Sequence, residues 1–127
     1  MSDPVGVVMA LIPLPLYYNS DEAGHRKPIE DERFTQSRDE VATMFGGAVL
    51  WVFRNEKPRG AWWNVGILYQ DELAALEVDI PNTPDSRQKL RTYASEVLLD
   101  RFEQEAIYVK LVPVETMLIT RDEVRRR

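Results

Sequence analysis

Residues 83–112 read TPDSRQKLRTYASEVLLDRFEQEAIYVKLV, and this stretch decides the fold. Thr83 is a good N-cap, Pro84 occupies the first helical position, and apolar residues then recur at spacings of three and four up to Phe102. Residues 106–112 alternate in polarity as a strand does. One face of this strand carries Ile107, Val109 and Leu111. The stretch therefore predicts a helix that runs with almost no loop into a strand.

The chain before this stretch predicts strands and one more helix. Unbroken apolar runs and helical spacing of apolar residues mark these elements. We expect strands over residues 5–12 and 48–53, a helix over residues 29–45 that Gly46 and Gly47 end, and two runs, 65–69 and 73–80, that form a hairpin or one long bent strand.

Pro13 and Pro15 are two residues apart, so the N–H groups that they lack lie on the same side of an extended chain. A neighbouring strand cannot be paired on that side. We therefore expect residues 13–18 to project past the end of a neighbour.

The order strand, helix, strand, strand, helix, strand predicts an α+β fold of the ferredoxin-like sandwich type (βαββαβ), in which two helices cover one face of an antiparallel sheet. The length of 127 residues suits a single domain, residues 1–127, with a core over about residues 5–113 and a C-terminal extension over residues 114–127.

Composition limits the classes of function. A net charge of −5 opposes contact with phosphate backbones, so we expect no nucleic-acid partner for this acidic chain. The absence of cysteine favours a cytoplasmic location. The apolar run over residues 5–16 is shorter than the roughly 20 residues that span a bilayer, and Asp3 stands where a leader would be basic. We interpret this run as a strand and expect a soluble protein with no membrane partner.

The strands over residues 5–12 and 48–53 are apolar at both odd and even positions, so both of their faces are apolar. The helices, however, cover only one face of the expected sheet. The second face should therefore also be covered. A second copy of the same sheet would give a twofold homodimer. The alternative is that residues 60–70 and 113–124 of the same chain fold over that face.

Trp62 and Trp63 could line an apolar ligand site or anchor an interface, although core packing of one and interface burial of the other is the simpler interpretation. Glu72 lies among apolar residues and Glu105 directly precedes a strand, so either carboxyl could be partly buried and act as an acid or base. The alternative for these carboxylates and for Glu103 is solvation or ion pairing with Arg101 or Lys110.

His25 is the only histidine, and it lies in a polar loop, where a solvated side chain is expected. One histidine without cysteine disfavours zinc, and the acidic residues show no calcium-loop pattern. The chain also has no phosphate-binding glycine motif and no nucleophile motif. We therefore assign no catalytic residue, no metal site and no cofactor.

Four sequence elements together resemble a family of small uncharacterised bacterial proteins with a predicted ferredoxin-like core. They are Leu16-Tyr17-Tyr18, Gly60-x-Trp62, Glu72 before the run that ends at Val78, and Arg101-Phe102-Glu103-Gln104-Glu105-Ala106-Ile107. The resemblance covers about residues 10–110. It implies the fold but no activity, because the family is described as of unknown function, and it nominates Trp62, Glu72, Gln104 and Glu105 as ligand- or partner-binding positions.

Three hypotheses about function follow. The first is a homodimeric α+β binding module for a small molecule or another protein, with no chemistry of its own. The second is an enzyme of the dimeric α+β barrel type that acts on a small apolar substrate, which rests on fold analogy alone. The third is an antitoxin-like or immunity-like regulatory partner, suggested by small size and negative charge.

Overall fold

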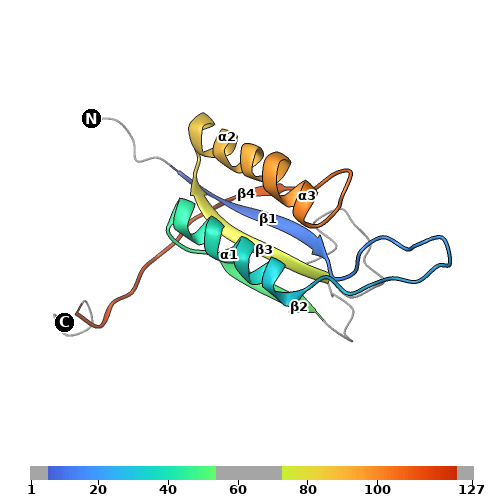
Figure 1. Cartoon of the computed structure of the whole chain (residues 1–127). Helices are drawn as coiled ribbons and strands as arrows, with labels where there is room; N and C mark the ends of the chain where they lie inside the picture. The colour runs from blue at the N-terminus through green and yellow to red at the C-terminus, as the bar shows by residue number, and fades with distance from the viewer. Residues whose placement is uncertain (1–5, 54–72, 123–127) are drawn as a thin grey trace.

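A computed structural model describes residues 6–53 and 73–122 (Figure 1). The elements follow the predicted order. They are β1 (Val7–Pro15), α1 (Asp31–Phe45), β2 (Val49–Phe53), β3 (Leu73–Pro81), α2 (Pro84–Tyr93), the π-helical turn η2 (Ala94–Leu98), α3 (Leu99–Arg101) and β4 (Lys110–Val114). The predicted run over residues 65–69 lies outside the described residues.

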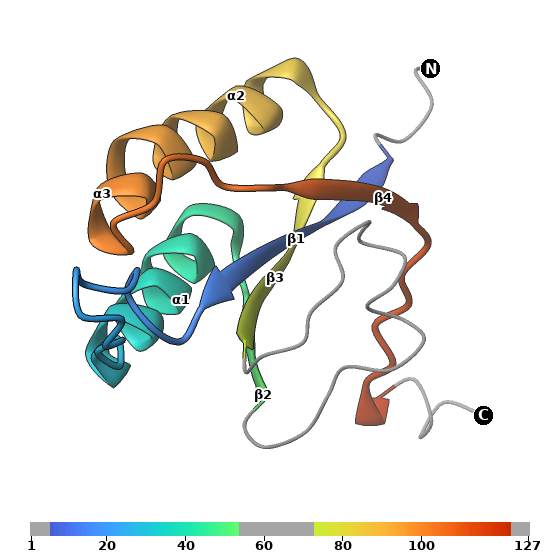
Figure 2. The same ribbon diagram turned by 90° about the vertical axis from the view of Figure 1, so that its right-hand side faces the viewer.

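The four strands form one antiparallel sheet in the order β2-β3-β1-β4, which confirms the α+β class and the antiparallel sheet. Both helices lie on the same side of this sheet, as Figures 1 and 2 show. The two inner strands are β1, which pairs with β3 and β4, and β3, which pairs with β1 and β2. We call the face under the helices the inner face and the opposite one the outer face.

The core forms where the inner face meets the helices. Every second residue of β1 is buried, and β3 contributes its own alternating set. These inner-face residues are Val8, Ala10, Ile12 and Leu14 from β1 and Ala74, Leu76, Val78 and Ile80 from β3. The rings of Phe34, from α1, and Phe102, at the end of the second helix, pack against each other in this core with centroids 5.1 Å apart.

Pro13 and Pro15 continue β1 beyond its predicted end at residue 12. Pairing with β3 runs without a break from Val7 to Pro15, whereas pairing with β4 stops at Leu11. A continuous ladder through both prolines requires that the N–H positions they lack point away from β3, toward β4. Residues 13–15 thus project past the end of β4, as the spacing of the prolines predicted.

The second helix begins where the sequence predicted, and Thr83 caps it by accepting a hydrogen bond from the Ser86 N–H at 3.1 Å. It continues to Arg101, but one turn of it is π-helical, so the Leu99 N–H bonds back to the Ala94 carbonyl. Ala94 and Leu98, the first and last residues of this turn, are both buried. The sequence pattern did not reveal this turn.

The predicted junction between helix and last strand was wrong. A strand was expected over residues 106–112, with almost no loop before it, but β4 is Lys110–Val114 and a loop follows the helix. Glu103 turns the chain with a left-handed φ of 51°, because the chain must cross from the helix layer to the sheet. The apolar residues of the loop, Ile107 and Val109, still pack against the core.

Replacing the capping residue tests the start of the second helix. Thr83→Ala should lower the free energy of unfolding by about 1 kcal/mol, because the Ser86 N–H loses its acceptor. Thr83→Ser keeps the hydroxyl and should stay within about 0.5 kcal/mol of the wild type. Urea unfolding followed by circular dichroism measures both. Equal losses in the two variants would show that the hydroxyl does not cap the helix.

Candidate functional site

Three of the predicted site residues, Trp62, Trp63 and Glu72, lie outside the described residues. Gln104 is partly buried, and its Nε2 donates to the carbonyls of Phe102 at 3.0 Å and Glu103 at 3.3 Å. Glu105 is exposed. The Gln104 amide therefore satisfies backbone groups where the helix ends, and the Glu105 carboxylate faces solvent.

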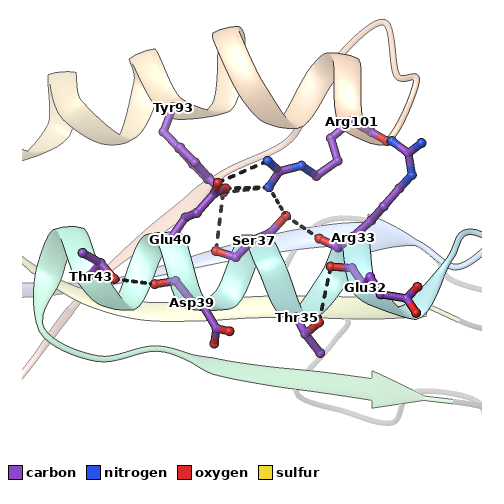
Figure 3. A network of polar contacts seen from close by, with 9 residues as sticks. All are labelled: Glu32, Arg33, Thr35, Ser37, Asp39, Glu40, Thr43, Tyr93 and Arg101. Carbon is purple, nitrogen blue, oxygen red and sulfur yellow. Dashed lines mark hydrogen bonds and ion pairs between the residues drawn. The ribbon is translucent and has the colours of Figure 1, made fainter.

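Polar side chains join the two helices in a cluster that the sequence did not predict (Figure 3). Arg101 Nη1 donates to Glu40 Oε1 at 2.6 Å and to Ser37 Oγ at 3.0 Å. The Tyr93 hydroxyl donates to the same Glu40 oxygen at 2.7 Å. From α1, Arg33 Nη1 donates in return to the Arg101 carbonyl at 2.8 Å. We call Arg33, Ser37, Glu40, Tyr93 and Arg101 the helix clamp.

Three ionisable groups of the clamp, Glu40, Tyr93 and Arg101, have pKa values shifted from their ordinary values. Hydrogen bonding from Arg101 is the main cause that lowers the pKa of the Glu40 carboxyl below its ordinary value. Burial is the main cause that raises the pKa of Tyr93 to about 12, and the hydrogen bond to Glu40 raises it further. The hydrogen bond to Glu40 also raises the pKa of Arg101. At neutral pH Glu40 is thus an ionised carboxylate, Tyr93 a neutral phenol and Arg101 a charged guanidinium.

This protonation pattern suits a structural role. A general acid or base works best with a pKa near the operating pH, and Glu40 and Tyr93 are shifted away from it in opposite directions. Arg101 is only 14% exposed, so its charge is satisfied chiefly by Glu40 and by Ser37. The sequence suggested only nearby glutamates as partners of Arg101. It did not suggest Glu40, because no local spacing marks a partner that is 61 residues away.

The outer face of the sheet follows from the strand register, because directly paired residues point to the same side. One row across the sheet contains Lys110, Leu11, Glu77 and Val49. The next row toward the proline end contains Pro13, Ala75 and Trp51. The outer face is therefore largely apolar, with Lys110 and Glu77 on either side of Leu11 and with Asp79 beside Met9 in the row on the other side.

Burial divides this outer face into two parts. Leu73 and Ala75 at the start of β3 are 2% and 0% exposed, whereas Val49 and Trp51 on the edge strand β2 are 43% and 46% exposed. Trp51 Nε1 donates to Glu77 Oε1 at 3.3 Å, which holds the indole over the neighbouring strand. Val52, on the opposite side of β2, is also 44% exposed. Among the described strands, β2 thus carries the most exposed apolar side chains.

Comparisons with protein-family models, with curated proteins and with solved structures found no match to this chain. Its function is therefore inferred from its own residues alone.

The described residues also bear on metal and membrane binding. Across residues 6–53 and 73–122, no group of three or more His, Asp or Glu side chains is placed to hold a metal ion. His25 lies in an exposed loop, with its side chain 83% exposed and its Nδ1 3.8 Å from Asp21 Oδ2. No helix in the described part of the chain is long and apolar enough to cross a membrane.

Removing the guanidinium tests the clamp. Arg101→Met should lower the free energy of unfolding by about 1–3 kcal/mol at pH 7, because Glu40 keeps its charge but loses its main donor. Arg38→Met is the matched control, since Arg38 forms an exposed pair with its neighbour Asp39, and should cost no more than about 1 kcal/mol. Urea unfolding at pH 7 compares the two losses. Equal losses would contradict the clamp.

The lowered pKa of Glu40 also predicts how the free energy of unfolding depends on pH. Because the pKa of Glu40 is lowered in the folded protein, its contribution is present above the ordinary carboxyl pKa and is lost as the pH falls through the lowered value. The stability difference between the wild type and Arg101→Met should therefore shrink below about pH 4.5. The same urea experiment, repeated from pH 7 down to acid, measures this difference. A difference that stays constant with pH would show that Glu40 is not the partner.

Proposed function

We propose that this chain is a homodimeric binding module for a small molecule or another protein, and that it self-associates through the outer face of its sheet. The observation that carries the proposal is the half-exposed Trp51 beside Val49 on the edge strand β2. Tryptophan is enriched among residues that dominate binding energy at interfaces. An exposed apolar edge strand is also a surface that natural proteins normally cover.

The distribution of charge supports a second copy as the occupant of this face. Lys110 and Glu77 lie in one row on opposite sides of Leu11. In a face-to-face twofold pair of sheets, Lys110 of each copy can approach Glu77 of the other. Opposite charges on one surface make that surface complementary to itself, whereas a face with a single sign of charge would repel its own copy.

We further propose that the fold is a ferredoxin-like sandwich. The order of elements, the central position of β1 and the antiparallel pairing of all neighbours support it. The resemblance to the family of small bacterial proteins stays a prediction.

The remaining parts of the proposal rest on composition. The absence of cysteine supports a cytoplasmic location, and the net charge of −5 supports partners other than nucleic acid. The enzyme and the regulatory partner stay predictions, because no described contact favours either of them.

Replacing the exposed tryptophan tests the dimer. Wild-type protein should have the mass of a dimer by light scattering at micromolar concentration, and Trp51→Lys should raise the dimer dissociation constant on the order of tenfold or more. Lysine suits this position because it removes the apolar surface and can still pair with Glu77 across the strands. Met44→Lys changes an exposed apolar residue of α1, in the helix layer, and should leave the dimer intact.

Two results would overturn the dimer proposal. One is a monomeric mass for the wild type, and the other is an equal loss of dimer in the Trp51 and Met44 variants. Circular dichroism of each variant shows whether it is folded, so that loss of association is not confused with unfolding.

A further inference from the structure

A groove lies between the second helix and the segment that leads into β4, and its volume is about 510 Å³. This is within the range of sites that bind small molecules. Its apolar lining comes from Leu90 and Leu99 of the helix and from Ile107, Val109 and Leu111 opposite. Leu90 is buried, and the other four are partly buried, so the groove has an aliphatic floor that solvent can reach.

The helical wall of the groove has a regular composition. Arg87, Arg91, Ser95 and Leu99 all line it, and they follow one another at spacings of four residues. Such residues form a stripe along one side of a helix. The small side chains of Ala94 and Ser95, at the start of the π-helical turn, leave room in the middle of this wall. Turns of this kind occur frequently at functional sites.

Two arginines give the groove a positive end. Arg87 is anchored by the side chain of Asn82, whose Oδ1 accepts from Nη2 at 2.7 Å and from Nε at 3.2 Å. An amide orients the guanidinium without neutralising it. Arg91, one turn further on, forms no hydrogen bond or ion pair with another described side chain, and none of the described residues lining the groove is acidic.

This arrangement is suited to binding an anion. Like charges four residues apart on a helix repel each other, and the chain as a whole is acidic, so carboxylates are plentiful elsewhere. A carboxylate between the two guanidiniums would remove the repulsion and gain charge-assisted hydrogen bonds. The aliphatic floor beside them would then accommodate an apolar body attached to that carboxylate.

We propose that the groove binds a small amphiphilic carboxylate, with its carboxylate at Arg87 and Arg91 and its apolar body over Leu99 and Ile107. This inference deepens the binding half of the proposed function and rests on it, but it does not need the dimer. The groove lies on the helix side at the β4 end of the sheet, away from Trp51 on β2.

Titration with octanoate and with octan-1-ol tests the proposal, because the two probes share a chain length and differ in charge. Backbone amide resonances of the folded protein should shift with octanoate at Arg91, Ser95 and Val109. Octan-1-ol should bind at least about tenfold more weakly, since it cannot replace the charge-assisted bonds. Arg91→Gln should weaken octanoate binding about tenfold and leave octan-1-ol unchanged.

Arg38→Gln is the matched control, because Arg38 belongs to α1 and pairs with Asp39. It should leave both affinities unchanged. The proposal fails if octanoate at up to about 10 mM shifts no groove amide, or if the two probes bind equally. It also fails if octanoate has no effect but an apolar peptide shifts the same amides, since the occupant would then be a peptide. Light scattering on the same samples reports the dimer separately, so either proposal can fail alone.

Discussion

The two missing N–H groups of Pro13 and Pro15 are the constraint on which much of the structure depends. They lie on the side of β1 that faces β4, where pairing stops at Leu11. If β4 extended backwards in the same register, Tyr108 would lie opposite Pro13. The Tyr108 carbonyl would then have no N–H group to accept from, because proline lacks one. The last strand therefore begins at Lys110, and the chain before it runs beside the helix without joining the sheet.

This short strand explains why a groove exists at one edge of the sheet. Ile107 and Val109 pack on the core without pairing with a strand, and the apolar groove lies between them and Leu99. On the side that faces α1, Arg101 is bound by Glu40 and fixes the two helices to each other. The helix is thus held firmly along one side and left accessible along the opposite side.

The sequence allowed the local structure to be predicted better than the long-range structure. Thr83 and Pro84 marked the second helix because caps and propensities act within one turn, and the prolines correctly indicated where a neighbour ends. The predicted start of β4 was wrong. Alternating polarity in residues 106–112 indicates that one side of the segment is buried, but it does not indicate that the segment is hydrogen-bonded to a neighbouring strand. The bond between Glu40 and Arg101 was missed, because it depends on how the helices pack. Two of the predicted site residues, Gln104 and Glu105, lie among the described residues. The Gln104 side chain donates to neighbouring backbone carbonyls.

The arginines of this acidic chain show which of its positive charges are available to a ligand. Arg33 and Arg101 are bound between the helices, and Arg38 pairs with its neighbour. Each of these three guanidiniums also pairs with a carboxylate: Arg33 with Glu30, Arg38 with Asp39 and Arg101 with Glu40. Arg87 is oriented by a neutral amide, and Arg91 faces the groove next to it. Acidic residues outnumber basic ones by 21 to 16 in the sequence, yet none of the described residues that line the groove is acidic, so Arg87 and Arg91 differ in this respect from Arg33, Arg38 and Arg101. The two guanidiniums adjoin an aliphatic floor, and this combination selects a ligand with one anionic end and one apolar end over an inorganic anion or a purely apolar molecule.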